Sequence, residues 1–457
     1  MRDGWLRTAR CAAAIGALAF GAAADVASST TVSIPPTELK QDAAPASAAI
    51  DPGPYDVALG DPPGCASVVV DTEQATIRRE PDGRSRRRGV AMRGARLPAL
   101  GSASGPGCAS TWYRVHEQGW ICGMSVSPSE EPAAAPRYPV VPDGEVTPWP
   151  YAFVRDTAIE YKFAGGALEE VRELQKGFGF GVAGTTSFEG QSFLKTAEGR
   201  LVPRGMAGIT SRLSEFSGMA ITDGRPWPIG WINARAAWAY DAPKKDKKRR
   251  VAQADRYEVF EVLEVSGEGK RGFVRFDEGA WFSLADVRIA RDAERPADVG
   301  DKEKWIDVDL ARQVITAYVG DAPVYATMIS TGRGGKSRTV KGEYRIWAKI
   351  AAIAMDNTEE AIEAMEALEL DDAGVPPEEV HLYSLRDVPW TQFFFESFAL
   401  HGVYWHDRFG DRRSHGCVNL SPIDARWFYE WTEPNVPDGW WAIHSATPTE
   451  GTVVRVR

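Results

Sequence analysis

Long apolar runs are scarce in this sequence of 457 residues. The run Cys11–Phe20 is too short to span a bilayer, which takes roughly 20 apolar residues, and no longer run follows it. The sequence therefore predicts no permanent membrane span. Arginines precede the run and small alanines follow it, a pattern typical of a secretory signal peptide over residues 1–24. We expect an exported protein of the periplasm or cell wall, with a buried N-terminal helix as the alternative.

The sequence also has no dominant block of one charge sign, and it has few cysteines. The formal net charge of −10 is spread along the chain, which argues against a general nucleic-acid binder. Only five cysteines are present, and Cys11 lies in the predicted signal peptide. If Cys417 stays a free thiol, then Cys65, Cys108 and Cys122 can form at most one disulfide in an oxidising compartment. Cys108 with Cys122 is favoured because both flank one predicted hairpin, although the sequence leaves a pairing of Cys65 open.

Composition divides the remainder of the chain into five parts and predicts a mainly β fold. Short strands bounded by turn residues dominate, while Ala, Ser, Pro and Asp fill the segment after the signal peptide. The expected parts are a disordered tether (25–63), a strand-rich module (64–130), a Pro-rich linker (131–150), a second strand-rich region (151–298) and a β-rich C-terminal domain (304–447).

A weak internal repeat links the two strand-rich regions. Residues 112–121 and 273–282 both read as an aromatic–Arg strand, a polar turn with glycine, and a Trp strand. The repeat resembles the bacterial SH3-like domains that accompany cell-wall enzymes. This resemblance implies small barrels that either bind wall polymers or act as spacers.

Two charged segments interrupt the strands. The basic run Lys244–Arg250 predicts a solvated loop, with contact to anionic wall polymers as the alternative. Within the C-terminal domain, Asn357 can cap a helix, and apolar residues recur at helical spacing in the acidic segment 357–380. We expect a helical insertion there, serving either as a lid or as a peripheral decoration.

A cysteine and several histidines gather near the C-terminus. Cys417 lies close in sequence to His401, His406 and His415. A thiol becomes a good nucleophile when a base takes its proton, and imidazole is the usual base. Gly416 leaves room beside the sulfur for a substrate carbonyl and for backbone N–H groups that stabilise an oxyanion. The pattern favours acyl transfer by a Cys/His pair.

The same stretch resembles the L,D-transpeptidase family of YkuD type. The family signature is a histidine followed, after a loop, by Ser/Thr-His-Gly-Cys-x-Asn/Arg, and residues 414–419 match it at every position. His401 and Gly402 supply the upstream half. The likeness extends over roughly residues 304–445, about a third of the chain. It implies a β-rich catalytic domain that acts on peptidoglycan stem peptides without a metal or organic cofactor.

The resemblance also implies roles for single residues. Cys417 is then the nucleophile and His401 the base, oriented by the Gly402 carbonyl. Backbone N–H groups of His415, Gly416 and Cys417 are expected to face the oxyanion. A nearby imidazolium and these N–H groups are expected to lower the thiol pKa. The supporting positions are Ser414 and Asn419, which hold the loop or touch substrate, and His406, a neighbour or substrate contact.

In the implied reaction, the cysteine attacks the carbonyl next to meso-diaminopimelate in a tetrapeptide stem, and D-Ala leaves. The acyl group then passes to an amine, which forms a 3→3 cross-link or a related linkage. Hydrolysis by water, giving an L,D-carboxypeptidase, is one alternative. Others are an inactive wall-binding protein and a three-histidine zinc site at His401, His406 and His415, which the adjacent thiol disfavours.

Overall fold

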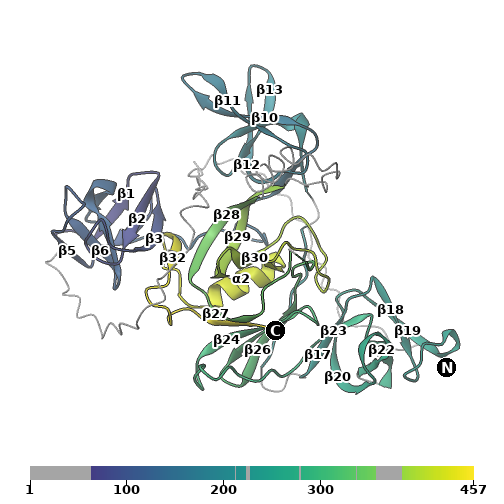
Figure 1. The fold of residues 1–457 in the computed structure, drawn as a ribbon. Coiled ribbons are helices and arrows are strands. Elements are labelled where there is room, and N and C mark those ends of the chain that lie inside the picture. The colour runs from purple at the N-terminus through teal and green to yellow at the C-terminus, as the bar shows by residue number, and fades with distance from the viewer. Residues whose placement is uncertain (1–62, 211–212, 223–226, 277–278, 336, 357–382) are drawn as a thin grey trace, which may run out of the picture.

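The computed structural model describes residues 63–210, 213–222, 227–276, 279–335, 337–356 and 383–457, and it is mainly β, as the sequence predicted. Figure 1 shows a C-terminal domain in the middle with three smaller β-domains around it. Among the described residues, no helix has the length and apolar character needed to cross a membrane. The predicted signal peptide, tether and helical insertion lie outside the described residues.

The C-terminal domain contains a six-stranded sheet. Its strands in spatial order are β16 (Met219–Ala220), β26 (Ala322–Met328), β25 (Val314–Val319), β24 (Lys304–Asp309), β33 (Val453–Val456) and β27 (Gly342–Arg345). β24 is buried along nearly its whole length, including the carboxylates of Asp307 and Asp309. β33 pairs in parallel with β24, so this sheet includes residues beyond position 447, where we expected the domain to end.

A second set of strands carries the candidate site. It comprises β28 (Ala348–Asp356), β29 (Ser384–Phe395), β30 (Phe398–Gly402), β31 (Val418–Leu420) and β32 (Trp440–His444). Helix α2 (Pro422–Trp431) packs on β29 and β30. Ser421 caps this helix by accepting a hydrogen bond from Asp424 N–H, and Pro422 opens it. The buried Asp424 carboxylate also accepts from Tyr325 and Thr327 of β26, which locks the helix to the first sheet.

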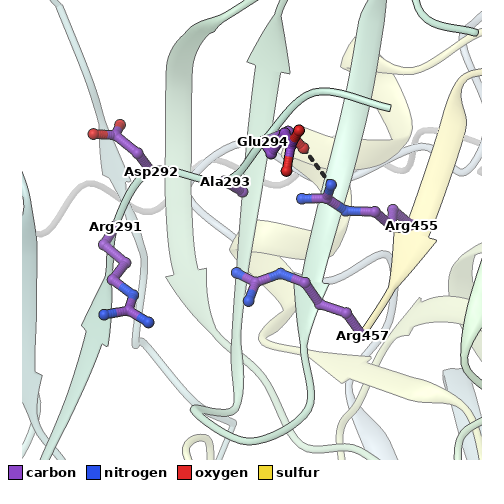
Figure 2. A pocket seen from close by; sticks show the side chains of 6 residues that line it. All are labelled: Arg291, Asp292, Ala293, Glu294, Arg455 and Arg457. Carbon is purple, nitrogen blue, oxygen red and sulfur yellow. Dashed lines mark hydrogen bonds between the residues drawn. The ribbon is translucent and has the colours of Figure 1, made fainter. Parts of the chain in front are cut away.

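An arginine cluster lies at the C-terminal end of β33 in the first sheet. Arg455 of β33 and Arg457, which follows the strand, both donate to the Asp307 carboxylate of β24. With Arg291 and Glu294 they line an open pocket of about 500 Å³ (Figure 2). None of the predicted site residues lines this pocket, so we treat the cluster as part of the sheet's support.

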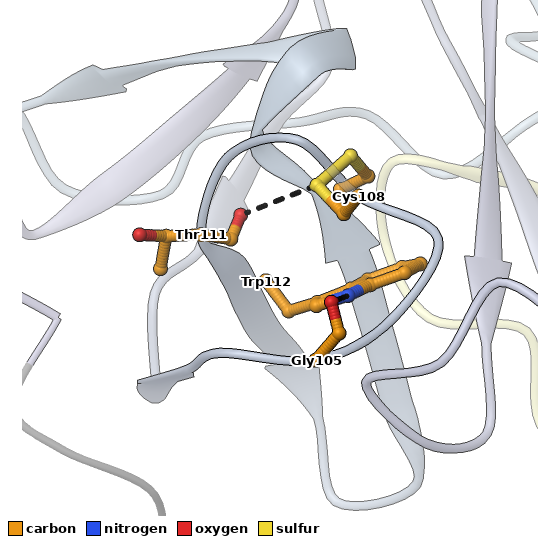
Figure 3. Close-up of a disulfide and its surroundings, with 5 residues drawn as sticks. Gly105, Cys108, Thr111 and Trp112 are labelled. Atoms are coloured by element: carbon orange, nitrogen blue, oxygen red, sulfur yellow. Dashed lines mark hydrogen bonds between the residues drawn. A yellow bond between two sulfur atoms is a disulfide. The ribbon is translucent and has the colours of Figure 1, made fainter.

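The first β-domain contains the only disulfide among the described residues. Its strands are β1 (Ser67–Val70), β2 (Gln74–Arg78), β3 (Arg87–Met92), β4 (Arg96–Pro98), β5 (Gly101–Ala103), β6 (Trp112–His116), β7 (Gly119–Cys122) and β8 (Val126–Ser129). Cys108 is bonded to Cys122 at the end of the β6–β7 hairpin, which confirms the favoured pairing (Figure 3). Cys65 is a free thiol. β3 pairs with β32, which attaches this domain to the C-terminal domain.

Residues 151–298 form two β-domains with separate hydrophobic cores. The second β-domain contains β9 (Tyr151–Val154), β10 (Ala158–Ala164), β11 (Ala167–Leu174), β12 (Gly179–Phe188), β13 (Gln191–Thr196), β14 (Leu201–Pro203) and β15 (Ala207–Ile209). The third contains β17 (Ile229–Ile232), β18 (Ala236–Tyr240), β19 (Arg250–Asp255), β20 (Val259–Ser266), β21 (Phe273–Phe276), β22 (Trp281–Ser283) and β23 (Val287–Ala290). Single 3₁₀ turns complete the described helices: η2 (Gly123–Ser125), η3 (Arg204–Met206), η4 (Lys247–Arg249) and η5 (Gly269–Arg271).

The internal repeat corresponds to a shared hairpin. In β6–β7, Arg114 lies opposite Trp120, and in β21–β22, Arg275 lies opposite Trp281. Arg275 also places its guanidinium 6.0 Å from the centre of the Trp281 ring. The sequence likeness therefore reflects the same cross-strand pair in two domains, while their SH3-like character stays a prediction.

Candidate active site

Two parallel strands bring the predicted residues together. In β30 and β31, His401 lies in register with Asn419. Cys417 directly precedes β31, whose first residue, Val418, pairs with Leu400. The strand pairing therefore brings the Cys417 end of β31 next to the strand that carries His401. Both strands are buried beneath helix α2.

His401 is buried and oriented by its own backbone neighbour. Its Nδ1 lies 3.1 Å from the Gly402 carbonyl oxygen, so Nδ1 carries the proton and Nε2 keeps its lone pair. The expected Gly402 contact is thus confirmed. Burial lowers the pKa of His401 to about 4, an effect that the Gly402 hydrogen bond only partly offsets. The ring is therefore neutral at pH 7 and able to accept a proton.

The Cys417 thiol is neutral in this structure. The residue is partly exposed, and Sγ lies 3.7 Å from the Ser397 carbonyl oxygen, which accepts its proton. Burial raises the pKa of the Cys417 thiol to about 11, although the Ala399 N–H acts in the opposite direction. The expectation of a lowered thiol pKa is therefore wrong for this state. It failed because burial disfavours the thiolate, and the neutral His401 supplies no positive charge to offset this.

Ser414 holds the loop that carries the thiol. Its hydroxyl donates to the Cys417 carbonyl oxygen at 2.5 Å and accepts from Gly416 N–H at 3.1 Å. The Gly416 N–H is thus already paired. Of the three N–H groups expected to face an oxyanion, those of His415 and Cys417 remain as candidates.

Gly416 lies where only glycine fits. Its φ is +144°, and a Cβ there would lie 2.6 Å from the Phe398 ring. Thr339 fixes the same turn, because its hydroxyl donates to the Gly416 carbonyl oxygen at 2.7 Å. Sequence reasoning did not find Thr339, which is remote in sequence from the motif. It also did not find Phe398, which lies three residues before His401 but carries no characteristic pattern.

His415 and His406 take different positions around the thiol loop. His415 is exposed and its ring stacks on Tyr383 at 4.9 Å, so its side chain lies outside the buried site. His406 is largely buried, and burial lowers its pKa to about 4. Its Nε2 lies 3.1 Å from the Asn419 side-chain amide.

The hydrogen bonds of His406 determine the orientation of Asn419. His406 Nδ1 accepts from Arg408 N–H at 3.3 Å, so its proton is on Nε2, facing Asn419. In its present orientation, the buried Asn419 Oδ1 has no hydrogen-bond partner among the described residues. With Oδ1 rather than Nδ2 facing His406, the Asn419 side chain accepts the Nε2 proton.

Two aromatic residues that follow His401, Tyr404 and Trp405, differ in exposure. Tyr404 is buried and donates to the Arg386 carbonyl oxygen, so it belongs to the core rather than to a groove. Trp405 is half-buried, with its ring 5.8 Å from that of His401. In the described parts of the chain, no three His, Cys, Asp or Glu side chains gather as a metal site would require.

The arrangement has the parts of a thiol acyl-transfer site. It combines a partly exposed thiol on a turn fixed by Ser414 with a neutral imidazole whose Nδ1 is hydrogen-bonded, which leaves Nε2 to accept a proton. A thiol with an adjacent base attacks carbonyl carbon, and N–H groups stabilise the resulting oxyanion.

Comparison with known families identifies the C-terminal domain. Residues 303–456 match the L,D-transpeptidase catalytic domain family, YkuD, and thereby confirm the resemblance found in the motif. Comparison with the curated proteins finds no match.

Solved structures of L,D-transpeptidases are similar to the chain. One from Mycobacterium smegmatis is 18% identical, with a TM-score of 0.25 and coverage of 42% of this chain and 81% of that chain. L,D-transpeptidase 3 from Mycobacterium tuberculosis is 16% identical, with a TM-score of 0.24 and coverage of 43% and 82%. One from Stackebrandtia nassauensis is 21% identical, with a TM-score of 0.21 and coverage of 35% and 58%. The match thus spans somewhat more than half of the Stackebrandtia chain.

Proposed function

We propose that residues 303–456, which match the L,D-transpeptidase catalytic domain, act as a cysteine L,D-transpeptidase on peptidoglycan stem peptides. The observation that carries this proposal is the geometry around Cys417. Cys417 follows the Gly416 turn at the start of β31, this strand pairs with the strand that carries His401, and the Gly402 carbonyl oxygen orients the His401 ring. Each step of the proposed mechanism uses only side chains and backbone groups of this chain.

The first step forms an acyl-enzyme. Cys417 Sγ attacks the carbonyl carbon between meso-diaminopimelate and D-Ala, and His401 Nε2 takes the thiol proton. Because the resting pKa values lie near 11 for Cys417 and 4 for His401, the proton moves during attack rather than before it. Backbone N–H groups of His415 and Cys417 stabilise the oxyanion. The C–N bond then breaks, and the imidazolium gives its proton to the departing amine of D-Ala.

The second step transfers the acyl group. The amine of a second stem attacks the thioester carbonyl, and His401 accepts the amine proton. The C–S bond breaks and the sulfur recovers a proton from the imidazolium. A new amide is formed, and the enzyme returns to its starting state. Water in place of the amine gives hydrolysis of the same thioester.

Muropeptide mass spectrometry tests the proposal. The purified protein is incubated with tetrapeptide muropeptides, with Cys417→Ala as the control. We expect new cross-linked dimers and released D-Ala with the wild type only. Trimmed stems without dimers would assign water as the acceptor. Unchanged muropeptides under varied conditions, or equal turnover by Cys417→Ala, would contradict the proposal.

The domains upstream suit a wall-associated enzyme. In the third β-domain, the 3₁₀ turn Lys247–Arg249 is exposed, and Arg250 stacks over the exposed Trp238 ring at 4.4 Å. We infer that this hairpin contacts anionic wall polymers, and that the protein is exported to the periplasm or cell wall. Salt-dependent pelleting with purified cell walls tests the contact, since an electrostatic contact weakens with ionic strength.

A further inference from the structure

The segment Asp407–Asp411 connects His406 to the thiol loop and lies against the third β-domain. Groups of that domain donate to it along its length. The bonds are Tyr257 OH to Asp407 Oδ1 (2.9 Å), Arg256 Nη2 to Phe409 O (3.0 Å), Arg288 Nε to Gly410 O (2.7 Å) and Asn233 Nδ2 to Asp411 Oδ1 (3.0 Å). Two of these acceptors are backbone carbonyl oxygens, so the third β-domain fixes the backbone of segment 407–411 and not only its side chains.

The contact between segment 407–411 and the domain is closely packed. Gly410 has φ +93°, and a Cβ there would lie 2.2 Å from Asn233 Oδ1. Phe409 is buried in a core shared with Ile229 and Trp231 of β17. The third β-domain therefore contributes both apolar and polar surface to this part of the site.

Tyr257 adopts an unusual backbone conformation at this contact. Its φ is +74°, a costly value for a bulky residue that persists only where surrounding contacts enforce it. Its N–H donates to the Ile232 carbonyl oxygen, and its ring packs on Phe216 at 4.3 Å. This conformation places the hydroxyl on Asp407, which suggests that the contact has a function.

Segment 407–411 is linked directly to the catalytic strands. Arg408 N–H donates to His406 Nδ1, and the His406 Nε2 meets the Asn419 side chain. Asn419 in turn lies in register with His401 on the neighbouring strand. A shift of the segment would therefore move His406 and release the Asn419 amide beside the thiol.

We propose that the third β-domain is a positioning element of the active site. Arg288 and Tyr257 are positioning residues that act through segment 407–411 to hold His406 against Asn419. The catalytic consequence rests on the proposed function, but the positioning itself does not. Movement of this domain, for example on contact with a wall polymer, would then change the reactivity of Cys417.

Paired variants test this proposal. Tyr257→Phe removes only the hydroxyl, and Arg288→Met removes the bonds to Gly410. Tyr240→Phe and Arg275→Met are the matched controls, because Tyr240 packs on Phe273 and Arg275 pairs with Glu264 in the same domain. Deuterium exchange of the amides in 406–417 and the alkylation rate of Cys417 by iodoacetamide are measured alongside kcat and KM.

For Arg288→Met, we expect the amides of residues 406–417 to exchange deuterium faster than in the wild type, and the alkylation rate of Cys417 to differ from that of the wild type. Tyr257→Phe should show the same changes more weakly. We also expect kcat to fall by ~10-fold for Arg288→Met with KM changed less, since small displacements of reacting groups are costly. The controls should match the wild type. Unchanged exchange and alkylation in both test variants would overturn the proposal.

A double variant tests the route through His406. If Arg288 acts by placing His406, then Arg288→Met should change the Cys417 alkylation rate little in a His406→Ala background. Fully additive effects would overturn this route. If the wild type lacks turnover on muropeptides, the proposed function fails, while exchange and alkylation still decide the positioning proposal.

Discussion

Tyr151 of the second β-domain and Tyr404 of the C-terminal domain stack face to face, with ring centres 3.7 Å apart and planes within 6°. Both rings are buried, and each hydroxyl donates to a carbonyl oxygen of β29, that of Asp387 for Tyr151 and that of Arg386 for Tyr404. Tyr404 follows His401 by three residues. The second β-domain is thus anchored directly behind the strand that carries the candidate base.

Replacing Tyr151 should loosen this anchor. We expect Tyr151→Ala to lower the free energy of unfolding by about 3–5 kcal/mol, since it removes a buried aromatic ring. Tyr151→Phe should cost only ~1 kcal/mol, the usual value of one hydrogen bond. Phe163→Ala, at an exposed position of the same domain, is the control and should change stability by ~0.5 kcal/mol or less. Urea unfolding measures all three; a neutral Tyr151→Ala would show that the stack does not anchor the domain.

His401 and His406 should differ strongly in their effect on turnover. His401→Ala removes the proposed base and should lower kcat by ~10²–10⁴-fold. His406→Ala leaves the base in place and should lower kcat much less, because His406 contacts Asn419 rather than the thiol. Steady-state release of D-Ala compares the two variants. Should His406→Ala prove the more damaging, their roles must be exchanged.

The raised thiol pKa predicts an alkaline alkylation profile. An ordinary thiol ionises near pH 8.5, whereas the Cys417 pKa lies at about 11. The rate of Cys417 alkylation by iodoacetamide should therefore keep rising well above pH 8.5. Mass spectrometry of the peptide containing Cys417 gives the rate at each pH. A plateau at or below pH 8.5 would instead indicate a thiolate paired with an imidazolium.

Buried histidines predict a loss of stability in acid. Burial lowers the pKa of His401, His406 and His444 to about 4, from about 6.5 in an unfolded chain. The unfolded chain therefore binds more protons between these values, so stability is full above pH 6.5 and falls as the pH drops toward 4. Thermal unfolding across this range measures the loss. His444→Gln, at a position that the proposed mechanism does not use, should make the loss smaller without changing kcat. An unchanged slope would contradict the burial argument for His444.

Local sequence patterns were sufficient to predict several features of the structure. The motif around Cys417 predicted the family of the C-terminal domain and the contact between His401 and Gly402, because these residues are neighbours in sequence and their chemistry depends on residue type. The β6–β7 hairpin likewise predicted the bond between Cys108 and Cys122, since a hairpin brings residues close to its ends into contact.

Other features depended on contacts between distant segments. The sequence alone determined that a cysteine, a histidine and a glycine turn share one β-rich domain. Only the tertiary structure decided the protonation of Cys417 and His401, because a pKa depends on burial by surrounding strands. It also decided that the third β-domain holds segment 407–411, since Arg288 and Gly410 meet only after both domains have folded and packed together.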